Sequence, residues 1–208
     1  MESMDQFSYL TVDGISEGLY KEKGSKFISF VFPVESEEEA KRHLERIKKQ
    51  FHDARHHCFA WIIRPDKSLY RASDDGEPNH SAGDPILGQL RSKNLTHVMA
   101  VVVRYFGGTK LGVGGLIVAY RSATQDALDK AIIVEKEIEE NVTLKYDYAY
   151  TSEVMRLIKD FDLTILFQDF QSECKLQASI KLKWKARFVE KTNLLNATGT
   201  SINVEWSD

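Results

Sequence analysis

A glycine-rich stretch flanked by basic residues is the part of this sequence best suited to binding chemistry. Lys110 lies inside the stretch, and Arg104 and Arg121 lie on either side of it. Backbone N–H groups left open by glycine, together with the positive end of a following helix, can hold an anion such as phosphate. We therefore expect an anion-binding or RNA-binding site here. Its residues are Arg104, Gly107, Gly108, Lys110, Gly112, Gly114, Gly115 and Arg121.

The elements around the glycines fit this expectation. Residues 98–103 form a continuous apolar, β-branched run, typical of a strand buried on both faces. Residues 116–128 carry apolar side chains at helical spacing. The loop between them is neither a P-loop, because Val113 follows Gly112, nor a dinucleotide fingerprint, because Ile117 occupies the place of the third glycine. The glycines could also serve only a tight, left-handed connection between strand and helix.

A second polar loop precedes this stretch and is rich in carboxylates and turn formers. Its carboxylates could bind a hard cation or act as acid and base, although the spacing is not that of an EF-hand. It could equally be a turn that caps a helix over 85–93, with Asp84 as the N-cap. We expect it to lie beside the glycine loop in one surface site. Its residues are Asp74, Asp75, Gly76, Glu77, Pro78, Ser81 and Gly83.

Histidines and cysteines give no comparable signal. His52, His56, His57 and Cys58 match neither the spacing of a zinc finger nor that of an H-E-x-x-H site, so we expect no metal. The basic residues over 41–57 are interpreted as a solvated helix face. We find no nucleophile–base pair and predict no catalytic residues.

Composition sets limits on the class of protein. The chain has 208 residues, 42% of them apolar and 28% charged, with a net charge of −3. These values indicate an ordinary globular chain of one or two domains and argue against a polycation that coats nucleic acid. We expect no membrane span and no signal peptide. Cys58 and Cys174 form no CxxC pair and are predicted to be buried free thiols of a cytoplasmic protein.

The order of predicted elements changes character after residue 134. Before it we expect strands over 7–12, 15–21, 26–34, 58–64, 69–72 and 98–103, and helices over 36–51, 85–93 and 116–128. Ser36 and Glu39 form a capping box at the first helix. After it we expect strands over 138–150, 163–170, 174–184 and 201–206, and helices over 151–161 and 185–197. The second half therefore has the β-α-β-β-α-β order of a ferredoxin-like domain.

The motifs together resemble a known family. The run RYFGGTKLGVGGL at 104–116 resembles the signature of the IMPACT/YigZ family. The likeness extends to DDGEP at 74–78, SAGDPIL at 81–87 and RHHCFAW at 55–61, and so covers roughly residues 15–130. Asn79, His80 and Ser81 depart from the small residues and threonine that family members usually have there. Length and the pattern after residue 135 are similar to those of the bacterial two-domain members.

The resemblance implies an α+β protein of two domains, residues 1–134 and 135–208. The first would be an α/β sandwich similar to the second domain of a small-subunit ribosomal protein, a fold shared with small-molecule kinases. The second would be a ferredoxin-like βαββαβ domain similar to the one at the end of elongation factor G. Eukaryotic members of the family regulate translation by interfering with activation of a starvation-response kinase.

The function implied is that of a noncatalytic, translation-linked factor that contacts RNA, the ribosome or a ribosome-associated protein, without a cofactor, DNA specificity or a membrane. Arg104, Lys110 and Arg121 would neutralise phosphates, and an exposed Tyr105 or Phe106 could stack on a base. An alternative is an enzyme or binder of a phosphorylated small molecule such as a nucleotide, with magnesium held by the acidic loop. A third is a protein-interaction module with an inert glycine loop.

Overall fold

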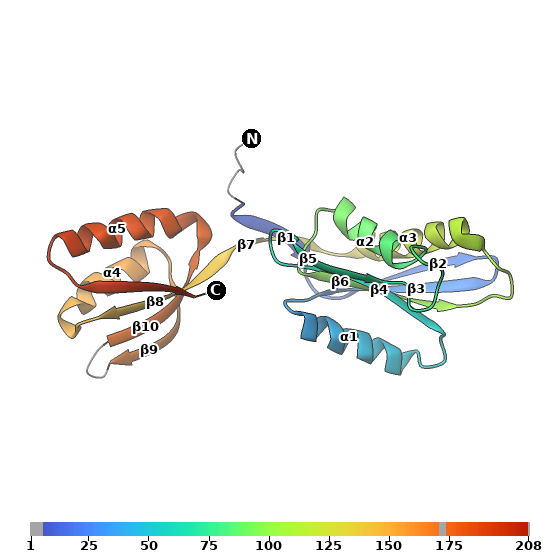
Figure 1. Ribbon diagram of the computed structural model, residues 1–208, viewed down its shortest axis with the longest axis horizontal. Coiled ribbons are helices and arrows are strands. Elements are labelled where there is room, and N and C mark those ends of the chain that lie inside the picture. The colour runs from blue at the N-terminus through green and yellow to red at the C-terminus, as the bar shows by residue number, and fades with distance from the viewer. Residues whose placement is uncertain (1–5, 171–173, 208) are drawn as a thin grey trace. The chain divides into compact units, whose positions relative to one another are not determined.

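The computed structural model describes residues 6–170 and 174–207, which form two compact units (Figure 1). Residues 9–136 make up the N-terminal unit, and residues 137–207 with residues 6–8 make up the C-terminal unit. The division falls after Lys136, two residues beyond the change in sequence pattern at 134. Both units mix helices with a β-sheet, so the fold class is mixed α and β.

The N-terminal unit is built on a five-stranded antiparallel sheet in the order β2-β3-β6-β4-β5. The central strand β6 carries the apolar run predicted to be buried on both faces, and it is buried from Val98 to Arg104. The prediction is therefore confirmed for this strand. The strand bounds are β2 Ser16–Glu22, β3 Ser25–Pro33, β4 His56–Ile63, β5 Leu69–Ser73 and β6 Val98–Tyr105.

Helices cover both faces of this sheet (Figure 1). Helices α2 (Gly83–Ser92) and α3 (Gly112–Lys130) pack on one face, where Phe27, Val102 and Tyr120 belong to one apolar core. Helix α1 (Glu37–Gln50) packs on the opposite face, over a second core. Strand β6 contributes to both cores, while α3 contributes to the first only, with Leu116 near its start.

The predicted capping box at α1 is confirmed in part. The Ser36 hydroxyl accepts a hydrogen bond from the Glu39 N–H at 3.2 Å. The Glu39 carboxylate accepts from the N–H of Glu35 at 2.8 Å, one residue before the N-cap. Both bonds satisfy backbone N–H groups at the N-terminus of α1 and so stabilise the first turn of the helix.

Two helices begin at positions other than those predicted. Helix α3 begins at Gly112 rather than Leu116, because apolar periodicity marks only its buried face from Leu116 onward, while its exposed first turn contains glycines of low helix propensity. Helix α2 begins at Gly83, and its N-cap Ala82 forms no side-chain capping bond. The prediction of Asp84 as N-cap is wrong, since Asp84 lies inside the helix.

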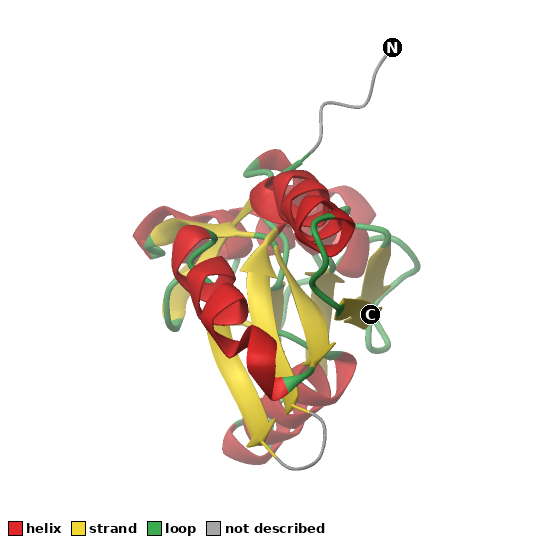
Figure 2. Cartoon of the chain, turned by 90° about the vertical axis from the view of Figure 1, so that its left-hand side faces the viewer, coloured by secondary structure: helices red, strands yellow, loops and turns green. Residues whose placement is uncertain are grey.

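The C-terminal unit has the element order β-α-β-β-α-β. Its four antiparallel strands run β11-β8-β10-β9, and Figure 2 faces this unit with its strands in yellow. Its elements are β8 Glu139–Tyr146, α4 Thr151–Asp160, β9 Thr164–Phe170, β10 Cys174–Lys181, α5 Lys185–Ala197 and β11 Ile202–Ser207. Strands β8 and β10 end before residues 150 and 184 because short 3-10 turns, Tyr148–Tyr150 and Leu182–Trp184, follow them. The predicted junction at 171–173 lies outside the described residues.

Helices α4 and α5 lie on the same face of that sheet, over a core that includes Leu144, Leu176 and Phe188 (Figure 1). Strands β1 (Ser8–Val12) and β7 (Ile133–Glu137) pair as a separate two-stranded sheet. Cys58 and Cys174 are buried free thiols, as predicted. No helix among the described residues is long and apolar enough to cross a membrane.

Candidate functional site

A cleft of about 890 Å³ opens in the N-terminal unit where β6 ends and α3 begins. Four segments line it: residues 53–56 before and at the start of β4, Glu77 and Pro78 of the acidic loop, residues 104–106, and residues 110–113 together with Leu116. The cleft therefore brings parts of the acidic loop and of the glycine loop to one place.

The N-terminus of α3 forms one wall of the cleft. Gly112 and Val113, its first two residues, line the cleft, and the N-cap Leu111 forms no side-chain capping bond. The first turn contains no acidic residue. Because the first N–H groups of a helix have no partner within the helix, this 19-residue helix presents hydrogen-bond donors and its positive end there.

A buried ion pair joins the glycine strand to the acidic loop. Arg104 Nη1 donates to Glu77 Oε1 at 2.6 Å, and the two side chains are only 8% and 4% exposed. The Arg104 guanidinium lies over the rings of Phe27 and Phe106, with its Cζ 5.5 Å and 5.6 Å from their centroids. Its Nε–H is buried and has no hydrogen-bond partner among the described residues. Arg104 thus lies in the cleft wall with a buried Nε–H that has no partner among the described residues.

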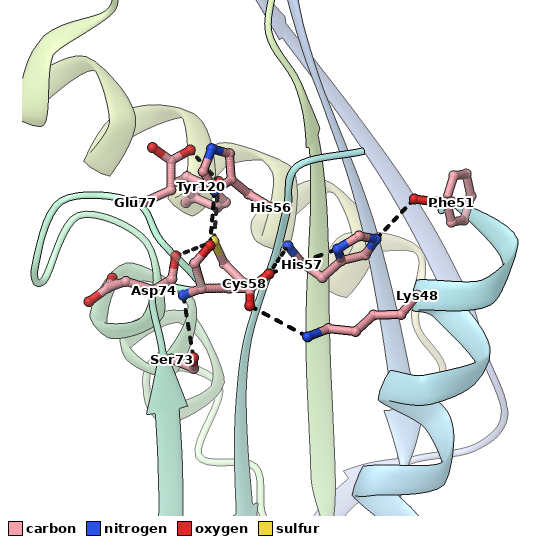
Figure 3. Close-up of polar contacts among 10 residues, drawn as sticks. Lys48, Phe51, His56, His57, Cys58, Ser73, Asp74, Glu77 and Tyr120 are labelled. Atoms are coloured by element: carbon pink, nitrogen blue, oxygen red, sulfur yellow. Dashed lines mark hydrogen bonds and ion pairs between the residues drawn. The ribbon is translucent and has the colours of Figure 1, made fainter. Parts of the chain in front are cut away.

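Glu77 also anchors a chain of polar groups beneath the cleft (Figure 3). The Tyr120 hydroxyl donates to Glu77 Oε1 at 2.8 Å. Cys58 Sγ lies 3.3 Å from that hydroxyl and 3.0 Å from the carbonyl oxygen of Asp74. Burial raises the pKa of the Cys58 thiol and of the Tyr120 phenol. Both groups remain protonated at neutral pH, so neither is an activated nucleophile.

Asp74 explains how α2 starts without a local cap. Its Oδ1 accepts from the N–H groups of Ala82 and Gly83, each at 2.9 Å, and its Oδ2 accepts from the N–H of His80 at 2.9 Å. Burial acts to raise the pKa of this carboxyl, but the three N–H groups outweigh it and lower the pKa below 3.8. Asp74 is thus the cap that the sequence interpretation assigned to Asp84.

Asp75 connects the same loop to β4 and α1. Its Oδ2 accepts from the N–H of His57 at 2.7 Å, and its Oδ1 lies 3.4 Å from Lys48 Nζ. Its carbonyl oxygen lies 2.9 Å from His56 Nδ1. Asp75 adopts φ +40°, a region that costs energy for a residue other than glycine. This local strain is held by contacts on both sides of the loop.

The three carboxylates of the acidic loop are therefore engaged with groups of the protein itself. Across residues 6–170 and 174–207, no group of three or more His, Cys, Asp or Glu side chains is placed to hold a metal ion. The arrangement suits a rigid frame for Glu77 better than a magnesium site. Gly76, Ser81 and Gly83 support that frame: Gly76 has φ +86°, the Ser81 hydroxyl donates to the Pro78 carbonyl, and Gly83 packs on the backbone of Ser73.

The glycines of the glycine loop have separate tasks. Gly107 packs against the β2–β3 turn, where an added Cβ would lie 1.9 Å from the carbonyl carbon of Gly24, and its N–H donates to Ser25 Oγ. Gly108 and Gly112 adopt φ +88° and +71°. Gly114 and Gly115 lie in the first turn of α3. The connection itself thus requires Gly107, while the later glycines keep the helix terminus open.

Of the remaining predicted site residues, Lys110, Tyr105 and Phe106 line the cleft and Arg121 does not. Lys110 is exposed at the cleft, and Phe106 is 55% exposed there. Tyr105 is half-buried, and its hydroxyl donates to Asp53 at 2.7 Å, which raises the pKa of the phenol. Arg121 does not line the cleft; it lies on another hollow of about 470 Å³, with His80 and Asp84.

Residues 53–56 were missed by the sequence interpretation, which began the strand at Cys58. Strand β4 begins at His56, and His56 pairs with Arg104 across the sheet. This register carries Asp53 and Arg55 to the cleft. The cleft then holds three cations, Arg55, Arg104 and Lys110, and two carboxylates, Asp53 and Glu77. The cations outnumber the carboxylates, and the positive end of α3 adds to this excess, so the cleft favours an anionic ligand.

Comparison with known proteins assigns the chain to a family. The Impact N-terminal domain model matches residues 23–128, which is more than half of the sequence. The chain belongs to the IMPACT family. This IMPACT family chain is 32% identical to IMPACT family member YvyE of Bacillus subtilis over 190 residues, covering 91% of this chain and 88% of that protein. It is 36% identical to IMPACT family member YigZ of Escherichia coli, covering 81% and 84%.

Two further relatives differ in how much of this chain they match. A solved structure titled as a crystal structure of a hypothetical protein is 32% identical to this IMPACT family chain, with a TM-score of 0.76 and 98% of each chain covered. The Protein IMPACT homolog of Saccharomyces cerevisiae is 35% identical over 95 residues, covering 44% of this chain and 36% of that protein. The likeness to the yeast protein thus concerns a part of each chain.

Proposed function

We propose that this IMPACT family member is a noncatalytic, translation-linked regulatory factor that binds ribosomal RNA through the cleft at the N-terminus of α3. One observation carries the proposal. An uncapped helix start without acidic residues opens onto a cleft that also exposes Lys110. Helix N-termini bind phosphate groups through backbone N–H donors and the helix dipole. The translation link rests on family membership.

The chemistry of the cleft supports a binding role over catalysis. The carboxylates that could act as base or metal ligand are already bonded to backbone or side-chain donors, and the buried thiol and phenol are held protonated. The 55% exposed Phe106 provides a ring on which a base can stack. Arg121, outside the cleft, is available to a second phosphate of the same RNA.

We extend the proposal to the relationships of the two units and to the compartment. The N-terminal unit is proposed to be related to the second domain of a small-subunit ribosomal protein, and the C-terminal unit to the ferredoxin-like domain at the end of elongation factor G. The βαββαβ order and the strand order β11-β8-β10-β9 support the second relationship. A factor that meets the ribosome is expected in the cytoplasm.

The test is binding of the full chain to purified ribosomal subunits and to a structured RNA at 50 and 200 mM salt. For two to three phosphate contacts, affinity should fall roughly 10- to 40-fold between these salt concentrations. Lys110→Ala should weaken binding and lower the salt slope by about 1. Lys130→Ala is the matched control, because Lys130 ends α3 about 27 Å from Gly112 at the start of the helix. Absence of binding at both salt concentrations contradicts the proposal.

A second candidate, a binder of a nucleotide or another phosphorylated small molecule, is favoured by the dimensions of the same cleft. Its volume of about 890 Å³ lies within the range of small-ligand sites, and Leu111, Val113 and Leu116 give it an apolar wall. Thermal stabilisation by a nucleotide without measurable binding to RNA would favour this candidate. Ribosome binding that is unchanged by Lys110→Ala and insensitive to salt would favour a protein-interaction module.

A further inference from the structure

We infer that the cleft selects a nucleoside 5′-phosphate monoester, either the 5′-phosphorylated end of an RNA strand or a free mononucleotide of the same chemistry. This inference rests on the proposed function and narrows it. It predicts that the phosphate recognised is terminal, whereas a general RNA-binding surface would accept the phosphodiesters within a strand.

The first argument concerns the number of donors in the cleft. The first turn of α3 presents the N–H groups of residues 112–115, with no side chain capping them. A terminal phosphate offers three strong acceptor oxygens and carries about −1.5 to −2 charges at pH 7. An internal phosphodiester has two non-bridging oxygens and one charge. A clustered set of helix N–H donors is thus better satisfied by the monoester.

The second argument is independent and comes from Arg104. Its Nη1 is taken by Glu77, but its Nε–H is buried without a partner, and the side chain as a whole is 8% exposed. A buried donor left unpaired destabilises the protein, and a ligand that bonds it removes that cost. The planar guanidinium keeps Nε–H on a different edge from the Nη1 contact, so an oxyanion can bond it while Glu77 stays in place.

Phe106 is the exposed ring beside this guanidinium. Its ring centroid lies 5.6 Å from the Arg104 Cζ, and its side chain is 55% exposed. We expect so exposed a ring to rotate when the ligand binds and to leave the guanidinium accessible from the cleft. The ring can then stack on the base next to the phosphate.

The third argument concerns balance of charge. Glu77 already offsets Arg104, and Tyr105 donates to the Asp53 carboxylate. Lys110 and Arg55 are exposed at the cleft and form no ion pair within the part of the chain that the structure describes. The Tyr105 hydroxyl is neutral, so the Asp53 carboxylate keeps its charge; Arg55, Lys110 and Asp53 together leave one net positive charge, to which the α3 dipole adds about half a charge. This sum is nearer to the charge of a monoester, about −1.5 to −2, than to the single charge of a phosphodiester, which would leave about half a positive charge unmatched.

The experiment compares one short single-stranded RNA with a 5′-phosphate and with a 5′-hydroxyl, binding to the full chain in solution. We expect the phosphorylated strand to bind at least 10-fold more tightly, and this preference to shrink in Lys110→Ala, which leaves the α3 N–H groups and Arg104 in place, but to stay unchanged in Lys130→Ala. Because both lysines are exposed, both variants should fold. Equal affinity for the two strands overturns this inference and leaves the proposed RNA binding intact; binding of neither strand overturns both.

Adenosine 5′-monophosphate and adenosine distinguish the two sources of the ligand. Competition by the monophosphate and not by adenosine, at comparable affinity to the RNA, identifies a free mononucleotide as sufficient. Competition at least 100-fold weaker than by the phosphorylated strand identifies an RNA end, with further contacts along the strand. Equal competition by adenosine and its monophosphate contradicts the inference, because it shows that the phosphate is not recognised.

Discussion

The buried pair between Arg104 and Glu77 makes a strong prediction about stability. Arg104→Met should destabilise the N-terminal unit by about 3–5 kcal/mol, because it leaves the Glu77 carboxylate, 4% exposed, with only the Tyr120 hydroxyl as donor. That loss is a large fraction of the ~5–15 kcal/mol that stabilises a typical domain. At about 4 °C per kcal/mol for a unit of this size, the Tm should fall by about 12–20 °C.

A double-mutant cycle isolates the pair from the packing of the arginine stem. Glu77→Gln keeps an acceptor for Tyr120 but removes the charge, and should also destabilise when made alone. In the double variant neither charge remains buried, so we expect it to be more stable than Arg104→Met. The coupling energy should be about 2–4 kcal/mol.

Urea unfolding followed by Trp61 fluorescence provides the assay. Trp61 is the tryptophan of the N-terminal unit and is 5% exposed, whereas Trp184 and Trp206 belong to the C-terminal unit. A Trp184→Phe/Trp206→Phe background leaves one tryptophan, whose selectively excited fluorescence reports the unit that contains the pair. Additivity of the two substitutions within about 0.5 kcal/mol would refute the reasoning, because groups coupled in a buried pair do not act independently.

Three further outcomes follow from the site. Gly107→Ala should destabilise the protein by several kcal/mol or prevent folding, since the added Cβ would lie 1.9 Å from the Gly24 carbonyl carbon. Gly114→Ala should raise the Tm slightly, because its Cβ meets open space and alanine favours the helix. Equal Tm values for the two variants contradict this. Asp74→Asn should destabilise at pH 7, because the lowered pKa of Asp74 stabilises the fold only where its carboxyl is ionised. The difference should begin to shrink as the pH falls below about 3.8, the ordinary pKa of the carboxyl, and should vanish once the pH lies below the lowered pKa of the folded state; a difference that does not shrink with falling pH contradicts this. Cys58, fully buried with a raised pKa, should react with a thiol reagent only after denaturant is added, as measured by absorbance.

Local patterns in the sequence predicted much of the architecture. The apolar run of β6, the helix over 185–197 and the Ser36 cap of α1 all follow from residues close together in the chain, and all three are confirmed. Periodicity and capping are local properties, so a single sequence reveals them. The glycine-rich stretch follows β6, and a cleft lined by Lys110, Gly112 and Val113 opens there; that this cleft is a functional site stays a prediction.

The details of the cleft depend on contacts between distant residues. Glu77 meets Arg104 across 27 positions, and no local pattern indicates that this cation is neutralised inside the fold. Asp74 caps α2 from eight and nine residues upstream, which made Asp84 the plausible but wrong choice. His56 pairs opposite Arg104 through sheet register. Such pairings are set by tertiary packing, and the low helix propensity of glycine likewise concealed the first turn of α3.

Phosphate binding at the N-terminus of α3 can be observed by amide NMR on the full chain. A 15N-labelled sample is titrated with the RNA that binds in the two-salt experiment. We expect the largest shifts at the N–H groups of residues 112–115 and at the Arg104 Nε–H, with little change near Lys130. Strong binding with shifts confined to other residues would contradict it.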